Sequence, residues 1–143
     1  MKLATLNDGT KDGQLIIVSK DLKTFVEVQD VVSNMQNAMD NWDSVKTLLE
    51  DISIELNAGK IKSNTFDARL VHSPFPRSFQ WADGSAYVNH VHLVRKARGA
   101  EMPESFWTDP LMYQGGSDDF YPPMSPILLC LLYTSDAADE SLC

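Results

Sequence analysis

The chain has 143 residues, of which 43% are hydrophobic and 22% are charged, and its formal net charge at pH 7 is −8. That length fits one domain, or one small domain and part of another, and the composition is typical of a globular rather than a disordered protein. The acidic balance argues against nucleic acid or an anionic membrane as a partner.

The first 30 residues predict a small β-sheet. The apolar start is followed at once by the polar Asn7-Asp8-Gly9, so there is no secretory pattern and we expect a cytoplasmic protein. Residues 15–19 are a β-branched run between turn residues, and residues 25–28 follow a second polar turn. These two short strands predict a β-meander or an SH3-like unit that is marginal by itself.

From residue 31 onward the apolar residues recur at helical spacing. A first helix is followed by a second that begins at Asp43 or Ser44 and ends at Asn57-Ala58-Gly59. We predict a helical hairpin that packs on the strands, and the polar residues 60–67 after it as an interdomain linker. The residues assigned to the core are Met35, Ala38, Met39, Trp42, Val45, Leu48, Leu49, Ile52 and Leu56.

Residues 85–98 predict a third helix that holds the residues most suggestive of chemistry. Asp83 precedes it in a turn dipeptide, and its simplest role is that of an N-cap, while Gly99 ends the helix. On spacing alone, His90 is either a core histidine or a functional one. His92 points away from His90, so the two do not share one metal ion. The predicted inward face is Tyr87, His90, Val91 and Val94.

Two further patterns leave a structural and a functional interpretation open. The basic residues 95–98 are either a solvated helix end or a contact for a substrate anion. Residues 115–119 are either a turn or part of an active-site lid. In the loop between these segments, Phe106 and Trp107 are predicted to be buried anchors.

The pattern Trp81-x-Asp83-Gly84-Ser85-x-Tyr87-x-Asn89-His90 resembles the start of the catalytic domain in the fumarylacetoacetate hydrolase family. The longer stretch DGSAYVNHVHLVRKARGAEMPESFWTDPLMYQGGSDDF is similar to a bacterial branch of that family, and the opening MKLATLNDGTKDGQLIIVSKDL resembles its small N-terminal domain. The resemblance implies an α+β protein. Residues 1–72 would form a small N-terminal domain of β-meander and helices, and residues 73–127 would begin a mainly-β catalytic domain.

The resemblance implies roles for particular residues. Asp83 would be a carboxylate ligand of Mg²⁺ or Ca²⁺, and His90 would be the general base that activates water. Tyr113 and Arg95 would contact the substrate, with Arg98 as a competitor for the role of Arg95. The implied reaction is hydrolytic cleavage of a C–C bond in a β-dicarbonyl acid such as fumarylacetoacetate, in tyrosine and phenylalanine catabolism, by a homodimer.

One departure from the family leaves the substrate open. The family shows a His-Gly-Arg run after the tyrosine, whereas this chain has Gln114-Gly115-Gly116 after Tyr113. An alternative inside the family is a hydratase, isomerase or decarboxylase of 2-oxo acids. An alternative outside it is a stand-alone, non-catalytic binding module.

The last residues have a composition of their own. Residues 130–140, CLLYTSDAADE, resemble the translation of a transposase adapter used in preparing sequencing libraries. We therefore expect residues 128–143 to be an artefactual tail, so that Cys130 and Cys143 say nothing about redox compartment. In the family the remaining metal ligands and catalytic partners come later in the sequence, and we expect the chain to be a fragment that is inactive as it stands.

Overall fold

The computed structural model describes residues 1–109, 111–116 and 119–127, and it is a mixed α+β structure, as predicted. The contacts within the chain divide it into two compact units. Among the described residues, the first unit is Met1–Pro76 together with residues 120–127, and the second is Arg77–Asp119. Residues 128–143, with the predicted tail and both cysteines, lie outside the described residues, and the predicted domain boundary at residue 72 stays a prediction.

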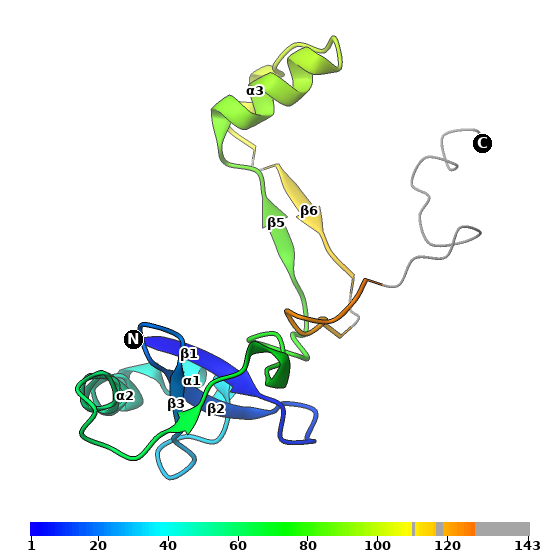
Figure 1. Ribbon diagram of the computed structural model, residues 1–143. Coiled ribbons are helices and arrows are strands. Elements are labelled where there is room, and N and C mark those ends of the chain that lie inside the picture. The colour runs from blue at the N-terminus through cyan, green and yellow to red at the C-terminus, as the bar shows by residue number, and fades with distance from the viewer. Residues whose placement is uncertain (110, 117–118, 128–143) are drawn as a thin grey trace. The chain divides into compact units, whose positions relative to one another are not determined.

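The first unit is built on an antiparallel four-stranded sheet with the strand order β1-β2-β3-β4 (Figure 1). The predicted meander is confirmed, and β2 and β3 each begin one residue before the predicted ranges. β1 and β4 fall outside the predicted strands, and β4 lies in the stretch 60–67, which joins the sheet rather than serving as a linker. The strands are β1 (Lys2–Leu6), β2 (Gln14–Val18), β3 (Thr24–Glu27) and β4 (Asn64–Thr65).

Strand β2 is the centre of this unit because both of its faces are buried. Leu15 and Ile17 belong to one hydrophobic cluster, whereas Ile16 and Val18 belong to another. Successive residues of a strand point to opposite faces, so an unbroken apolar run fits a strand that is covered on both sides. β2 also has both edges paired, with β1 and β3.

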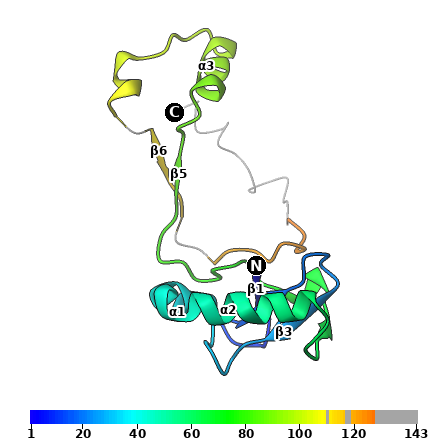
Figure 2. The ribbon, with the colours of Figure 1, turned by 90° about the vertical axis from the view of Figure 1, so that its left-hand side faces the viewer.

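Two consecutive helices contribute to the first of these clusters, α1 (Met35–Asp40) and α2 (Trp42–Asn57). The side chain of Asn34 caps α1 by accepting a hydrogen bond of 2.9 Å from the backbone N–H of Asn37. Only Asn41 separates the two helices, and Figure 2 shows them lined up one after the other. The predicted helical hairpin is therefore wrong, because a single residue does not reverse the chain.

Which leucine of α2 is buried depends on the side of the helix that faces the sheet. Val45 and Leu49 lie four residues apart on the face toward the sheet and are buried, whereas the side chain of Leu48 is 54% exposed. Leu48 and Met39 are thus not core residues, which corrects the prediction for both. The end of the helix is as predicted: Gly59 has a φ of +65°, the left-handed conformation typical of a helix stop.

The segment that follows the helices contributes to the second cluster, on the other face of the sheet. Val71 and Phe66 pack with the second cluster, and Val71 forms an isolated β-bridge with Leu6 at the outer edge of β1. The fully buried Thr5 donates a hydrogen bond of 2.7 Å from its hydroxyl to the carbonyl of Pro74. The sheet is therefore covered on both faces within the first unit. This segment includes the 3₁₀ turn η1 (Ala68–Leu70).

The second unit holds the residues to which the sequence points. Its elements are β5 (Ala82–Gly84), α3 (Val88–Ala97), the 3₁₀ turn η2 (Glu104–Trp107) and β6 (Met112–Gln114), and β5 pairs with β6. Asp83 lies in a strand and not at a helix N-terminus, which corrects the prediction. The helix begins three residues later than predicted, after Tyr87. Gly99, with a φ of +70°, follows its end as predicted.

Side-chain exposure in the second unit differs from the predicted pattern. α3 buries Val91, but His90 and Tyr87 are exposed, so the interpretation of His90 as a core histidine is wrong. Trp107 is 70% exposed and is not a buried anchor, while Phe106 is half-buried. Across the described residues of both units, none of the helices has the length and apolar character needed to cross a membrane.

Candidate functional site

Asp83 and Tyr113 lie directly opposite each other in the β5–β6 pair. Two backbone hydrogen bonds flank them, from Ser85 N–H to the Leu111 carbonyl at 2.9 Å and from Gly115 N–H to the Trp81 carbonyl at 3.0 Å. Directly opposed residues of an antiparallel pair present their side chains on the same face. The predicted metal ligand and a predicted substrate contact, 30 positions apart in the sequence, therefore become neighbours on one exposed surface.

Trp81 lies on the same face of the β5–β6 hairpin, at its base, where β5 begins and β6 ends. Its ring lies 5.8 Å from the ring of Tyr113, with an angle of 51° between their planes. The indole also occupies the space beside Gly115, where a Cβ atom would lie only 1.9 Å from a ring carbon. Glycine at 115 is thus needed for the packing of Trp81.

Gln114, at the position where the resemblance implies histidine, also supports the β5–β6 pair. Its side-chain oxygen accepts a hydrogen bond of 2.9 Å from the amide of Gln80, and its own amide donates to the carbonyl of Trp81 at 3.4 Å. The run Gln114-Gly115 therefore has a structural role in this chain. The predicted turn or lid at residues 115–119 includes residues 117 and 118, which lie outside the described part of the chain.

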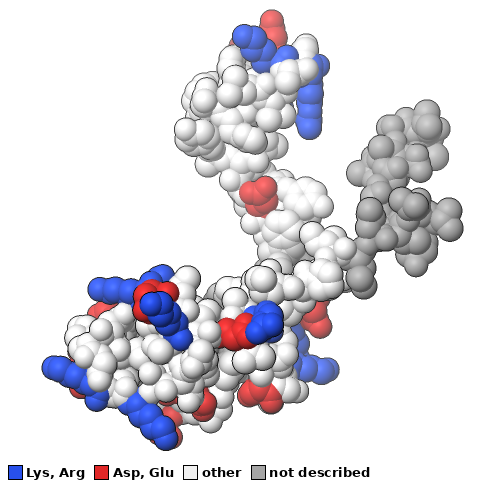
Figure 3. All heavy atoms as spheres, viewed as in Figure 1, with Lys and Arg blue, Asp and Glu red and all other residues white. Residues whose placement is uncertain are grey.

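His90 and Arg95 line one pocket of about 450 Å³, which we call the basic pocket. It is also lined by Ser85, Val91, Arg98 and Leu111. The guanidinium of Arg95 donates a hydrogen bond of 3.2 Å to the carbonyl of Glu101, which fixes it near the end of α3. Figure 3 shows Lys and Arg side chains gathered at the α3 end of this unit. None of the described lining residues is an acid, so the pocket is suited to an anion.

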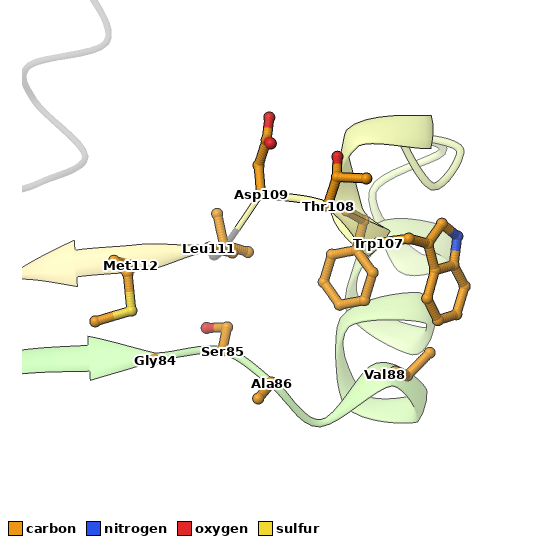
Figure 4. Close-up of a pocket in the computed structure, with 10 residues that line it drawn as sticks. Gly84, Ser85, Ala86, Val88, Trp107, Thr108, Asp109, Leu111 and Met112 are labelled. Carbon is orange, nitrogen blue, oxygen red and sulfur yellow. The ribbon is translucent and has the colours of Figure 1, made fainter.

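A second pocket of about 350 Å³, which we call the aromatic pocket, is drawn in Figure 4. It is lined by Ser85, Val88, Phe106, Trp107, Leu111 and Met112, among others. The rings of Phe106 and Trp107 meet edge to face at 5.5 Å and 83°. Ser85 and Leu111 line both pockets and lie two residues from Asp83 and Tyr113. The strand pair and the two pockets therefore adjoin at the Ser85–Leu111 hydrogen bond.

Comparison with protein families adds an independent observation. A family described as fumarylacetoacetase N-terminal domain 2 matches residues 1–77, which is more than half of the 143-residue chain. The chain belongs to this fumarylacetoacetase N-terminal domain family. A search of curated proteins gives no match.

The fumarylacetoacetase N-terminal domain covers the N-terminal part of the first structural unit. Its match ends at residue 77, one residue after Pro76, where the contacts divide the chain. Both hydrophobic clusters lie within it. Asp83, His90, Arg95 and Tyr113 all follow the matched range, so their roles, like the bacterial branch, stay predictions.

The described residues do not fit a divalent metal by themselves. No group of three or more His, Cys, Asp or Glu side chains within them is arranged to hold an ion. Mg²⁺ and Ca²⁺ take about six or more oxygen ligands, and Asp83 supplies at most two. In a fumarylacetoacetase-type site the other ligands would have to come from elsewhere.

Sequence reasoning missed the aromatic pocket and the residues that join it to the basic one. Ser85 and Leu111 carry no recognisable motif, and their role depends on strand pairing across 26 positions. Trp107 did give a signal, because it adjoins Phe106 in the loop that follows the predicted third helix. An aromatic pair of this kind is typical both of a core anchor and of a ligand contact, and only the exposure of Trp107 separates the two.

Proposed function

We propose that the second unit carries the first part of a hydrolase site that cleaves a C–C bond in a β-dicarbonyl acid. The observation that carries the proposal is the position of the Ser85–Leu111 hydrogen bond between the Asp83–Tyr113 pair and the basic pocket. Asp83, His90, Arg95 and Tyr113, whose roles the resemblance implies, thus lie on or beside the β5–β6 pair. Membership of the fumarylacetoacetase N-terminal domain family supports the same reaction class.

In this proposal His90 is the general base. An exposed imidazole has the access to water that this role needs. His90 takes a proton from water as the oxygen adds to a carbonyl carbon of the substrate. The adjacent C–C bond then breaks, and its electron pair leaves with the departing enolate.

The other residues position the substrate. Arg95, held by its bond to Glu101, would bind a substrate carboxylate in the basic pocket. The hydroxyl of Tyr113 would contact the substrate on the face that it shares with Asp83. Asp83 would supply one oxygen ligand to Mg²⁺ or Ca²⁺. Because one carboxylate does not complete such a site, we expect the 143-residue chain alone to be inactive and to bind these ions weakly.

The test joins the chain to the β-rich remainder of a fumarylacetoacetase catalytic domain and measures hydrolysis of fumarylacetoacetate with and without Mg²⁺. We expect no turnover by the chain alone and Mg²⁺-dependent turnover by the fusion. His90→Ala should lower kcat by about 10²- to 10⁴-fold, the usual contribution of a general base. His92→Ala is the matched control, because it removes an exposed imidazole from the same helix at a position that lines neither pocket.

A second pair of variants tests Asp83. Asp83→Asn should raise the Mg²⁺ concentration for half-maximal rate by at least about tenfold, since even outer ligand partners contribute that much. Glu104→Gln, which removes an exposed acid from η2, should leave it unchanged. Equal effects of His90→Ala and His92→Ala, or of the two acid variants, would rule out the assigned roles. Turnover to a hydrated, isomerised or decarboxylated 2-oxo acid would favour the alternative reactions.

A non-catalytic binding module is the second candidate. It is favoured by the placement of both hydrophobic clusters in the first unit, which gives that part a core of its own. The fusion distinguishes the two candidates: a module would fold as the chain stands, and the added catalytic remainder would bring no turnover that depends on His90.

A further inference from the structure

The aromatic pocket has a lining that the proposed hydrolysis does not use. Trp107 forms part of its wall with 70% of the residue exposed, and Phe106 packs edge-on against it. Val88 and Met112 add aliphatic and thioether surface (Figure 4). A large exposed aromatic surface at a concave site is typical of a place where an apolar group binds.

Charge distinguishes this pocket from its neighbour. Asp109 is the one acid among its described lining residues, and Figure 4 shows its carboxylate on the side away from Ser85 and Ala86. The basic pocket beyond Ser85 and Leu111 is lined by two arginines and a histidine. One ligand that reaches both pockets would therefore carry a negative charge at one end and an apolar group at the other.

We propose that the second unit binds an organic monoacid with an aryl or branched alkyl tail, and that Trp107 selects for the tail. The carboxylate lies in the basic pocket near Arg95 and Arg98, and the tail lies against the indole of Trp107 in the aromatic pocket. This inference rests on the proposed function for the placement of the acid group. It goes further by ranking substrates: a monoacid with an apolar tail binds more tightly than a diacid such as fumarylacetoacetate, because a second carboxylate in place of the tail would be desolvated against apolar surface.

The test measures binding to the intact chain with probes that contain no dicarbonyl group. Phenylacetate, 4-phenylbutanoate and 5-phenylpentanoate are titrated by calorimetry in the absence of metal, each beside the straight-chain acid that lacks the phenyl ring. For the chain length that spans the two pockets, we expect the phenyl acid to bind at least about tenfold more tightly, as apolar pockets discriminate. Arg98→Ala should weaken both acids of a pair equally, because both carry the carboxylate.

Variants at Trp107 decide the assignment. Trp107→Ala should bring the affinities of the phenyl acid and of its straight-chain partner to about the same value. Trp107→Phe should keep most of the difference, because an aromatic face remains. Leu93→Ala is the control, since Leu93 is an exposed apolar residue of α3 that lines neither pocket. Because Trp107 is largely exposed, its replacement should leave the fold intact, which the circular dichroism of the variant checks.

Three results would overturn the inference: no phenyl preference in the unchanged chain, a preference that survives Trp107→Ala, or no binding of either acid. These outcomes are separate from the failure of the proposed function. A fusion that hydrolyses fumarylacetoacetate through His90 but shows no phenyl preference would overturn only the present inference.

Discussion

Trp81 and Gly115 face each other at the base of the β5–β6 hairpin, and the indole of Trp81 fills the space that a side chain at position 115 would need. Gly115→Ala should therefore displace the ring and weaken its contact with Tyr113, at a cost of about 1–3 kcal/mol in hairpin stability, as overpacking does. Near-ultraviolet circular dichroism of the tryptophan bands would detect the displacement. Gly84→Ala is the control, because its Cβ would meet only the flexible side chain of Met112 at 3.3 Å. Identical spectra for the two variants would contradict the predicted packing.

Adjacent leucines of α2 should differ widely in their effect on stability. Leu49→Ala removes a fully buried side chain from the first hydrophobic cluster and should lower the free energy of unfolding by about 2–5 kcal/mol. Leu48→Ala makes the same chemical change at an exposed position and should cost less than about 0.5 kcal/mol. Urea denaturation followed by far-ultraviolet circular dichroism measures both. A similar cost for the two variants would mean that α2 does not turn Leu49 toward the core and Leu48 toward solvent.

The hydrogen bond from Thr5 to Pro74 should stabilise the segment that pairs with the outer edge of β1. Thr5→Val keeps the shape of the side chain but leaves the carbonyl of Pro74 without this donor, at a cost of about 1–3 kcal/mol. Thr65→Val, at an exposed position of β4, should change stability by less than about 0.5 kcal/mol. Amide hydrogen exchange in β2 reports the effect, since Val71 of this segment packs with Ile16 and Val18 of β2. Unchanged exchange in Thr5→Val would argue against the contact.

The pair Asp67 and Arg69 predicts an acid transition in the folded state. Hydrogen bonds from the Arg69 side chain lower the pKa of Asp67 from 3.8 to about 2. Because the pKa of Asp67 is lowered in the folded protein, the pair stabilises the fold at pH values above the ordinary pKa of 3.8. This contribution is lost as the pH falls toward 2. Nuclear magnetic resonance of the Asp67 carboxyl should give a midpoint near 2.

A charge variant checks the cause of that shift. Arg69→Gln should return the pKa of Asp67 toward its ordinary value of 3.8, because the charged donor is removed. Lys62→Gln removes a positive charge from an exposed position on the other side of β4 and should leave the midpoint where it was. If the Asp67 carboxyl of the unchanged chain had a titration midpoint near 3.8, the prediction would be wrong.

Patterns between near neighbours in the sequence were enough to predict part of the fold. The apolar run that became β2, the restart of a helix near Trp42, and the stops at Gly59 and Gly99 all depend on local propensity or on a single backbone conformation. The family that the residues resemble agrees with the family match over residues 1–77. The same resemblance singled out Asp83, His90, Arg95 and Tyr113, whose roles stay predictions.

The sequence by itself thus determined the α+β class, the principal helix and the family. Only the tertiary structure decided that Asp83 stands opposite Tyr113, that His90 is exposed, and that Ser85 and Leu111 join two pockets. The physical reason is the range of the interactions. A helix closes its hydrogen bonds within four residues, so its signal is local. Strands of two or three residues exist only where a distant segment supplies the partner, and the burial of a helix face depends on what packs against it.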